Sequence, residues 1–420
     1  MAVKNFDQVS FTSLLTENFT PSGTIKTPEK LFGRQKSLLQ IERALSSVGR
    51  QVLIYGDRGV GKTSVALTTA YLLNNAESAP IYVVCGEHDR FDDVIRAIGR
   101  RSLEVKKNFE TGKMSSGGGV TIFGVGATTT RTDETAFNIA TPLSINDALE
   151  VIRYISSHNK GRRIIVVDEM ERISSSIERA KFAEFIKNVP EVDDRAKFIF
   201  CGIASTVDEL IGAHPSAGRI LETIPLAKMH HNDLWSIIEN VAEKISIEVD
   251  KNMLIRISQL SDGFPHYVHL VGESMFWNVF DDQNTISNVA KSHFDAGIKG
   301  ALERAEPTLR QQYMKATMKT KNTEDYEHTL WSLADTNSDR RQLSEIYDSS
   351  YKRIARDKKG TNILSREKFN QRLLTLRKSN HGNVVTGYGS GWFGFRENII
   401  RGYVRLKAET QGIHLGRDIY

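Results

Sequence analysis

The sequence predicts an α/β fold: a parallel five-stranded sheet flanked by helices, followed by an all-helical segment and a basic C-terminal module. Short apolar runs alternate with helical patterns over residues 27–229, which is typical of a parallel sheet that helices cover on both faces. From about His230 the apolar spacing is helical throughout. Residues 340–420 hold 17 Lys or Arg and 7 Asp or Glu, against 39 and 44 in the rest of the chain.

Five apolar runs are the predicted strands, and each is short enough to be one strand of a buried sheet. They span residues 51–55, 80–85, 163–167, 197–201 and 223–226. Helical patterns lie between them, including residues 91–103, 145–155 and 177–189.

The composition is that of a soluble globular protein, with 40% hydrophobic and 25% charged residues. No apolar run approaches the ~20 residues that a membrane span needs, and residues 1–7 lack the apolar core of a signal peptide. Cys85 and Cys201 each follow an apolar run, which favours buried free thiols over a disulfide or a metal site. We therefore expect a cytoplasmic protein with no membrane partner.

A glycine-rich turn joins the first predicted strand to a helix. Residues 56–63 read Gly-Asp-Arg-Gly-Val-Gly-Lys-Thr, which fits the phosphate-binding pattern G-x-x-x-x-G-K-[ST]. A strand, a glycine turn and a helix aim backbone N–H groups and a helix N-terminus at phosphate. Lys62 would contact the β- and γ-phosphates, and the Thr63 hydroxyl would bind Mg²⁺. The predicted ATP-binding segment consists of Gly56, Asp57, Arg58, Gly59, Val60, Gly61, Lys62, Thr63 and Ser64.

Two adjacent carboxylates, Asp168 and Glu169, follow the third apolar run. The carboxyl edge of a parallel sheet is where ligands sit in open α/β folds. Asp168 is the predicted Mg²⁺ ligand, and Glu169 is the predicted base that accepts a proton from the attacking water.

The order of these features resembles AAA+ ATPases of the origin-recognition and initiator group, and the related signalling ATPases called STAND proteins. The resemblance covers roughly residues 30–400. It implies an ATP-hydrolysing nucleotide domain, a helical lid and a C-terminal winged helix. The segment Leu31-Phe-Gly-Arg34 is similar to the one that lies beside the adenine in such proteins, which makes Arg34 a candidate nucleotide contact.

The same resemblance implies three more site positions. Sensor 1, which orients the attacking water, falls on Ser205 or on Thr206 next to it, because the fourth strand ends there; the usual Asn is absent. The arginine finger that a neighbouring subunit supplies falls on Arg219, with Arg195 as the alternative.

In the lid, residues 262–266 read Asp-Gly-Phe-Pro-His. Pro265 resembles the proline of STAND lids that packs beside the base. His266 stands near the position where initiator-type relatives carry a sensor arginine, and a neutral imidazole senses phosphate weakly. We therefore expect slow, regulatory turnover. A proline that merely starts a helix is the alternative interpretation.

Four regions are expected along the chain: an N-terminal arm at 1–26, a nucleotide-binding domain at 27–229, a helical lid at 230–305 and a basic winged-helix domain at 306–420. Residues 111–130 are rich in Gly, Thr and Ser and predict a β-hairpin inserted into the nucleotide domain. This hairpin would either touch a neighbouring subunit or threaded strand, or be a plain surface loop.

The C-terminal module is expected to place three helices, at 324–334, 342–356 and 365–377, before a β-hairpin at 382–395 and a last helix from 398. Residues 365–378 would be the recognition helix, capped by Ser365. Its apolar positions, Phe369, Leu373 and Leu376, would face inward. Its polar positions, Arg366, Lys368, Gln371, Arg372 and Lys378, would face double-stranded DNA or a partner protein.

The sequence as a whole favours an ATP-driven switch that forms homo-oligomers and acts through DNA or an effector protein. The STAND resemblance implies a role in bacterial antiviral defence. The alternative is a DNA-handling ATPase, namely a replication initiator, a helicase loader or a transposition regulator. A third reading is a nucleotide-binding scaffold that barely hydrolyses ATP.

Overall fold

The computed structural model describes residues 3, 6–74, 79–110, 121–122, 125–128, 136–139, 144–157, 161–204, 207, 210, 217–318, 323–358 and 363–417. The chain divides into two compact units. The sheet unit comprises residues 24–57 and 61–227, and the helical unit comprises residues 1–23, 58–60 and 228–420. Each unit is described by itself.

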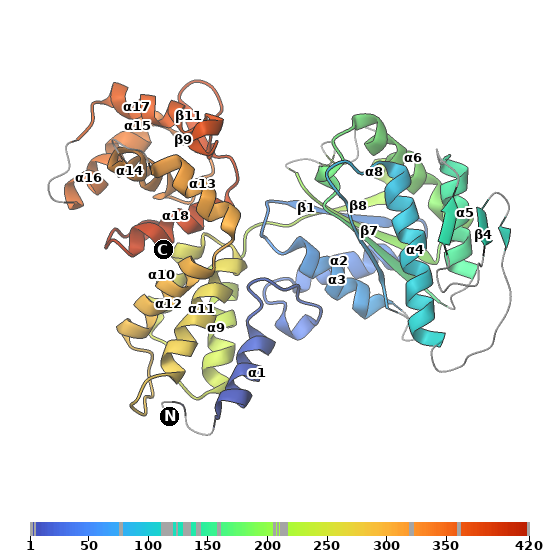
Figure 1. Ribbon diagram of the computed structural model, residues 1–420, viewed down its shortest axis with the longest axis horizontal. Helices are drawn as coiled ribbons and strands as arrows, with labels where there is room; N and C mark the ends of the chain where they lie inside the picture. Colours follow the sequence, from blue (N-terminus) through green and yellow to red (C-terminus); the bar gives the residue numbers. More distant parts are fainter. Residues whose placement is uncertain are drawn as a thin grey trace. The chain divides into compact units, whose positions relative to one another are not determined.

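The sheet unit is built on five parallel strands in the order β2-β6-β7-β1-β8 (Figure 1). The strands are β1 (Gln51–Gly56), β2 (Ile81–Val84), β6 (Arg163–Asp168), β7 (Ala196–Ile203) and β8 (Leu221–Pro225). They coincide with the five apolar runs, so the predicted fold class is confirmed. Consecutive residues of β6 are all buried, because helices cover both faces of the sheet.

Helices lie on the two faces of this sheet (Figure 1). On one face, α4, α5 and α6 enclose a core that includes Ile95, Ile152 and Phe182, packed against Ile165 and Phe198 of the strands. On the other face, α3 contacts β1, β6 and β7, and α2 contacts β1 and β8. The helices are α2 (Gln35–Ser46), α3 (Lys62–Leu73), α4 (Phe91–Glu110), α5 (Ile145–Ser157), α6 (Ser176–Val192) and the single turn α8 (Ala217–Ile220).

A second, small sheet is inserted between α4 and α5. Its strands, β3 (Thr121–Ile122), β4 (Val125–Thr128) and β5 (Ala136–Ile139), pair antiparallel in the order β3-β4-β5. The predicted hairpin at 111–130 therefore contains β3 and β4, and β5 adds a third strand beyond it. Residues 111–120 lie outside the described residues.

The helical unit begins with a helix that the sequence analysis did not predict. Within the N-terminal arm at residues 1–26, α1 (Gln8–Asn18) buries Phe11 and Leu15, which stand one helical turn apart. The Phe11 ring stacks on Phe280 at 4.4 Å between centroids and meets Trp277 edge-on at 5.4 Å. Four lid helices follow: α9 (His231–Lys244), α10 (Lys251–Ser261), α11 (Pro265–Phe280) and α12 (Lys291–Arg304).

The C-terminal part of this unit mixes helices with a three-stranded antiparallel sheet of order β10-β11-β9. Helices α13 (Pro307–Thr317) and α14 (Thr323–Ala334) precede β9 (Arg341–Gln342). The next helical stretch, 343–357, runs through α15 (Leu343–Glu345), a π-helical turn (Ile346–Tyr351) and α16 (Lys352–Asp357). Helix α17 (Arg366–Thr375), strands β10 (Val385–Gly387) and β11 (Trp392–Phe395), and helix α18 (Ile399–Glu409) complete it.

Buried arginines join the lid to this C-terminal part. Arg401 and Arg405 of α18 lie 3.1 and 3.3 Å from the carboxylate of Asp262, at the end of α10, and all three side chains are at most 1% exposed. Arg405 also donates to the Ala334 carbonyl at 2.8 Å and Arg401 to the Asn337 carbonyl at 2.9 Å. Burial lowers the pKa of Arg405 to about 10, and the charge of Asp262 opposes that shift.

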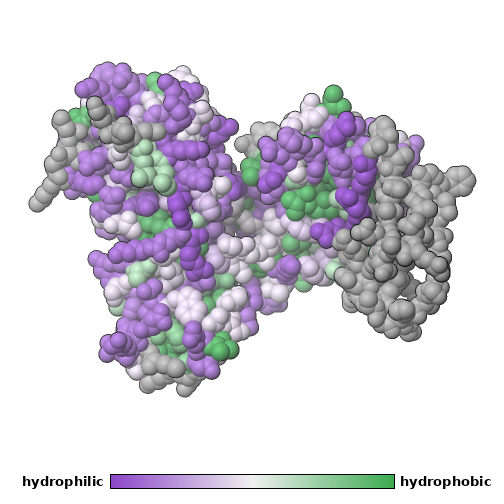
Figure 2. All heavy atoms as spheres, viewed as in Figure 1, coloured by the Kyte–Doolittle hydropathy of each residue, from purple (hydrophilic) through white to green (hydrophobic). Residues whose placement is uncertain are grey.

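The basic surplus of residues 340–420 is therefore partly internal. Arg341, Arg401 and Arg405 are all buried and bonded within the unit, so they add nothing to a basic surface. Figure 2 shows polar residues over much of one face of the molecule. In the part of the chain that the structure describes, no helix combines the length and the apolar character needed to cross a membrane.

Candidate nucleotide-binding site

The glycine-rich turn lies at the carboxyl end of β1. Gly56 ends the strand with a φ of +148°, and Gly61 caps α3 with a φ of +97°, both in the left-handed range that favours glycine. A Cβ on Gly56 would also collide with the Leu226 carbonyl. Helix α3 begins at Lys62, so its N-terminus opens into the turn.

Lys62 is held against this turn. Its side chain is buried, and its ammonium donates to the carbonyls of Gly56 at 3.0 Å and Asp57 at 2.7 Å. Burial lowers the pKa of Lys62, while the carboxylates of Glu171 and Asp168 oppose that shift. The carboxylates of Glu171 and Asp168 are therefore close enough to Lys62, at the end of the glycine turn, to affect its charge.

Thr63 and Asp168 come from separate elements and meet at the same edge of the sheet. The Thr63 hydroxyl donates to the Asp168 carboxylate at 2.6 Å, and the Tyr82 hydroxyl donates to the same oxygen at 3.2 Å. Burial and the charge of Asp168 raise the pKa of Tyr82, so Tyr82 remains a donor. The two residues predicted to hold Mg²⁺ are therefore adjacent.

The two glutamates that follow β6, Glu169 and Glu171, make contacts with different elements. Glu169, with a φ of +59°, pairs with Arg172 at 2.7 Å. Glu171 instead accepts a hydrogen bond from the Ile203 backbone at 2.8 Å, at the end of β7. Sequence reasoning missed Glu171; the signal was the third acid in Asp-Glu-Met-Glu, two residues after the first glutamate.

Two more predicted contacts lie in the sheet unit. Arg34, just before α2, is buried and donates to the Ala227 carbonyl at 2.9 Å. The Ser64 hydroxyl accepts from the Ile25 backbone at 3.2 Å. Both side chains tie the segments before α2 and after β8 to the edge of the sheet that carries the glycine turn.

The candidates for the arginine finger and for sensor 1 differ in exposure and in their partners. Arg219 is exposed on α8. Arg195, the alternative, is bound to Asp193, with the closest N–O distance at 2.5 Å. Ser205 and Thr206 lie outside the described residues.

The remaining candidates belong to the helical unit. Arg58, Gly59 and Val60 group with this unit. Pro265 occupies the first turn of α11, as a helix-starting proline does. Burial lowers the pKa of His266, which favours the neutral imidazole, and a hydrogen bond between its Nδ1 and the Pro21 carbonyl at 2.8 Å opposes that shift.

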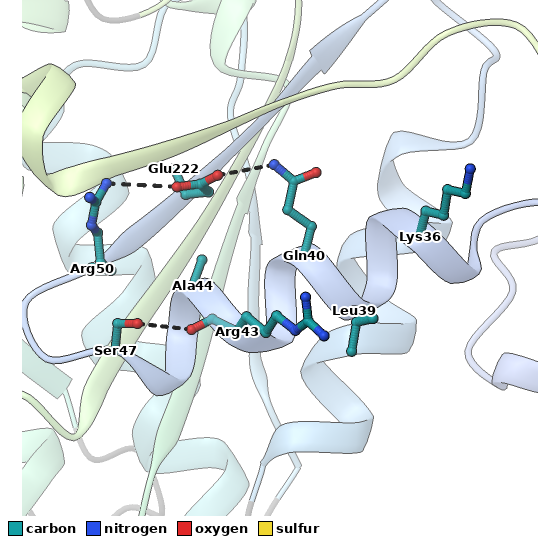
Figure 3. Close-up of a pocket in the computed structure, with 8 residues that line it drawn as sticks. All are labelled: Lys36, Leu39, Gln40, Arg43, Ala44, Ser47, Arg50 and Glu222. Atoms are coloured by element: carbon teal, nitrogen blue, oxygen red, sulfur yellow. Dashed lines mark hydrogen bonds and ion pairs between the residues drawn. The ribbon is translucent and has the colours of Figure 1, made fainter.

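A surface pocket of about 550 Å³ lies elsewhere in the sheet unit, between α2 and the edge strand β8 (Figure 3). Glu222 accepts from Gln40 at 3.0 Å and pairs with Arg50 at 3.7 Å, while Lys36 and Arg43 add two further cations. Arg50 directly precedes β1, so this end of the pocket is at the amino end of a strand. The glycine turn is at the carboxyl end, where open α/β sheets bind ligands. The pocket is therefore separate from the candidate nucleotide site.

The fold of the chain is similar to that of a solved protein. The chain is similar over 91% of its length, and 99% of the other chain, to a Walker-type ATPase of Pyrococcus abyssi, with 17% identity and a TM-score of 0.55. It also matches Cdc6p of Pyrobaculum aerophilum at 14% identity, with 95% and 98% coverage and a TM-score of 0.47. A match to the ORC1 protein of Aeropyrum pernix, solved in complex with DNA, has 14% identity, 91% and 95% coverage and a TM-score of 0.43. No curated protein was found to match the chain.

The sequence model of one family matches residues 24–394, which include both the glycine turn and the acidic segment after β6. A match of that extent covers most of both units. The chain therefore belongs to the family described as Novel STAND NTPase 1, or nSTAND1, and its core is that of a P-loop NTPase.

Proposed function

We propose that this protein binds ATP with Mg²⁺ and hydrolyses it slowly as a molecular switch. The observation that carries the proposal is the 2.6 Å contact between Thr63 and Asp168, beside a buried Lys62 at the same sheet edge. A threonine after the loop lysine and an aspartate after a neighbouring strand are the protein ligands of Mg²⁺ in P-loop NTPases.

The residues fit that ion. The Thr63 hydroxyl and the Asp168 carboxylate offer oxygen ligands, which Mg²⁺ prefers. Among the described residues, no group of three His, Cys, Asp or Glu side chains could hold a metal alone. This suits an ion that takes most of its ligands from phosphates and water, and which would neutralise charge on the phosphates. Lys62 would exchange its two carbonyl partners for phosphate oxygens.

Slow turnover is supported by the lid. His266 stands near the position that the family resemblance gives to a phosphate sensor, and its burial lowers its pKa, which favours the uncharged imidazole. A neutral imidazole stabilises the charge of a transferring phosphoryl group less than an arginine does. The nucleotide would then set the state of the protein for long periods.

The output is proposed to involve homo-oligomers and the C-terminal module. Arg219 is exposed and could reach a neighbouring subunit as an arginine finger, with Ser205 as sensor 1. The order helix, strand, two helices, two strands over residues 323–395 supports a winged helix. The module would engage an effector protein, and a defence role is supported by the STAND resemblance alone.

The test compares ATP binding and phosphate release in the wild type, Lys62→Ala and Lys187→Ala. Binding of a fluorescent ATP analogue would be followed by anisotropy, with Mg²⁺ and with EDTA. Loss of the buried cation should weaken binding by about 100-fold or more, the scale of strong charge-assisted contacts. Lys187, exposed on α6, is the matched control and should bind like the wild type. Equal affinity in all three proteins would refute the proposal.

A DNA-handling ATPase is the second candidate, and α17 favours it. Arg366 and Lys368 are exposed on this helix and Lys378 is exposed just after it, while Phe369 and Leu373 face inward as predicted. Arg372, by contrast, pairs with Asp325 at 2.8 Å. Retention of duplex DNA on filters at two salt concentrations, with and without ATP, would decide, because phosphate contacts make binding strongly salt-dependent. Only weak retention, unaffected by ATP, would exclude this candidate.

A further inference from the structure

The pocket between α2 and β8 has the size of a small-molecule site. Its volume of about 550 Å³ lies within the range of about 300–1,000 Å³ that such sites occupy. Lys36, Leu39, Gln40 and Arg43 recur at helical spacing, so they share the face of α2 that forms one wall (Figure 3). Glu222 of the edge strand β8 lies across from them. The pocket uses none of the residues assigned to the candidate nucleotide site.

The positive charges of this pocket outnumber the negative ones. Lys36, Arg43 and Arg50 line it, and Glu222 is the one acidic side chain among the described residues that do so. The carboxylate of Glu222 lies 3.7 Å from the Arg50 guanidinium, which is close to the limit of an ion pair. Within the described ranges of the chain, neither Lys36 nor Arg43 has a carboxylate partner for its exposed cation. The pocket therefore holds a surplus of two positive charges.

Neutral groups lie between these cations. Leu39 is 45% exposed and stands between Lys36 and Arg43 on α2, so it offers apolar surface inside the pocket. The Gln40 amide is fixed by its hydrogen bond to Glu222 at 3.0 Å. A single inorganic anion would fill little of the volume and would leave Leu39 in contact with water. A ligand that combines a doubly charged group with an apolar body would satisfy both parts of the wall.

We propose that this pocket binds a small organic phosphate monoester. A phosphate monoester carries about −1.5 to −2 charges at pH 7, which matches the surplus of the pocket. The planar guanidinium groups of Arg43 and Arg50 fit phosphate oxygens in pairs, and Lys36 adds a further cation. The organic body lies on Leu39. Glu222 positions Arg50 and also repels the bound anion, so it limits the affinity.

The first test is isothermal titration calorimetry of the wild type with three probes. Phenyl phosphate carries both the dianion and an apolar ring, inorganic phosphate lacks the ring, and benzoate has the ring with a single charge. We expect saturable binding of phenyl phosphate, about tenfold or more tighter than that of either other probe. Equal affinity for inorganic phosphate or for benzoate would overturn the assignment of the ligand class, and so would the absence of saturable binding.

The second test assigns the binding to the pocket. Lys36→Gln combined with Arg43→Gln should weaken phenyl phosphate binding by about 10–100-fold, because two charge-assisted contacts are lost. Both side chains are exposed, and the melting temperature verifies that the fold is kept. Lys187→Gln combined with Lys299→Gln is the matched control, since it removes two exposed cations from α6 and α12. The control should bind like the wild type, and an equal loss in both double variants would show unspecific attraction and refute the proposal.

A third variant should change the affinity in the opposite direction. Glu222→Gln keeps an oxygen acceptor for the Gln40 amide and removes the negative charge of the pocket, so phenyl phosphate should bind about threefold tighter or more. Unchanged or weaker binding would contradict the placement of the anion beside Glu222.

The glycine turn is the other place where a phosphate could bind, and Lys62→Ala separates the two sites. We expect this variant to bind phenyl phosphate within twofold of the wild type, whatever happens to its ATP binding. If Lys62→Ala loses phenyl phosphate while the Lys36 and Arg43 double variant retains it, the probe occupies the glycine turn. The inference about the pocket would then be wrong, and the proposed ATP site would stand.

Discussion

Two regions of this protein bring acidic and basic side chains together, and they do so for different ends. At the carboxyl edge of the five-stranded sheet, Lys62 rests on two backbone carbonyls and Asp168 on the hydroxyls of Thr63 and Tyr82. In the helical unit, Asp262 is enclosed with Arg401 and Arg405 at 1% exposure or less. Lys62 and Asp168, the open set, contact neutral groups that a ligand can replace. Asp262, Arg401 and Arg405, the closed set, neutralise one another's charges inside the protein. The comparison teaches that a count of charges along a sequence does not say which of them are available.

The largest effect is expected from Asp262→Asn. The change keeps a side chain that tolerates the left-handed backbone at this position, φ +53°, and removes only the charge. Two buried arginines would lose their carboxylate, which should lower the free energy of unfolding by about 3–5 kcal/mol. Urea denaturation followed by circular dichroism measures it. Asp295→Asn, at an exposed position of α12, is the control and should change stability by less than ~0.5 kcal/mol. Similar values for the two variants would show that the arginine cluster does not need its charge.

The next effect concerns the open set. Thr63→Val keeps the shape of the side chain and removes the hydroxyl that meets Asp168. We expect Mg²⁺-dependent phosphate release to fall by about 10–100-fold. Loss of the hydrogen bond to Asp168 should also lower the free energy of unfolding by about 1–2 kcal/mol. Titration of Mg²⁺ at saturating ATP separates weaker metal binding from lost chemistry. Wild-type Mg²⁺ dependence in this variant would mean that the ion is held elsewhere.

Acid should weaken a second ion-pair cluster of the helical unit, in which Glu409 meets Arg256 and His414, within a defined pH window. Burial alone would raise the pKa of Glu409, but bonds from Arg256 and His414 outweigh it and hold the pKa below its ordinary value of 4.5. A lowered carboxyl pKa adds stability above about pH 4.5, and that stability is lost as the pH falls through the pKa of the folded state. Glu409→Gln should therefore be less stable than the wild type at pH 7, by about 1–2 kcal/mol, and the difference should shrink toward pH 3. A difference that is constant across denaturation curves from pH 7 to pH 3 would contradict the prediction.

The smallest effect is expected on α17 and the residues just after it. Arg366 and Lys378 are exposed, so Arg366→Gln with Lys378→Gln should change the free energy of unfolding by less than ~0.5 kcal/mol. The same urea experiment measures it. A fall of more than ~1 kcal/mol in the free energy of unfolding would show that Arg366 and Lys378 stabilise the fold and are not free to bind a partner.

The sheet and its loop could be predicted because local pattern and fold agree there. Five apolar runs became the five strands, and the Gly-Lys-Thr of the loop and Asp168 converge as a parallel sheet requires. The features that could not be predicted depend on contacts between segments that are far apart in the sequence. The periodicity of α1 is weak, and nothing local indicates that Phe11 will meet Phe280. Nor does the sequence distinguish Arg401, which is buried, from Arg366, which is exposed.

The acidic segment shows the same limit at the site. Glu169 and Glu171 stand two residues apart in the sequence, and the single turn of 3₁₀-helix at Met170–Arg172 brings the carboxylate of Glu171 to the end of β7. A short turn reverses side-chain directions within three residues, and no periodicity rule resolves it. The pattern of charged residues was sufficient to locate the site but not to assign a contact to each carboxylate.

The contact of α1 with the lid also has a consequence for how the chain is made. The sheet unit is inserted between the first 23 residues of the helical unit and the rest of it. During synthesis at 5–20 residues per second, Phe11 must wait roughly 15–50 seconds before Phe280 exists. The inserted sheet unit can fold during that interval, while Phe11, Leu15 and Phe19 remain without the partners that later bury them. The apolar side chains of α1 therefore reach their packing partners only after translation has passed α11.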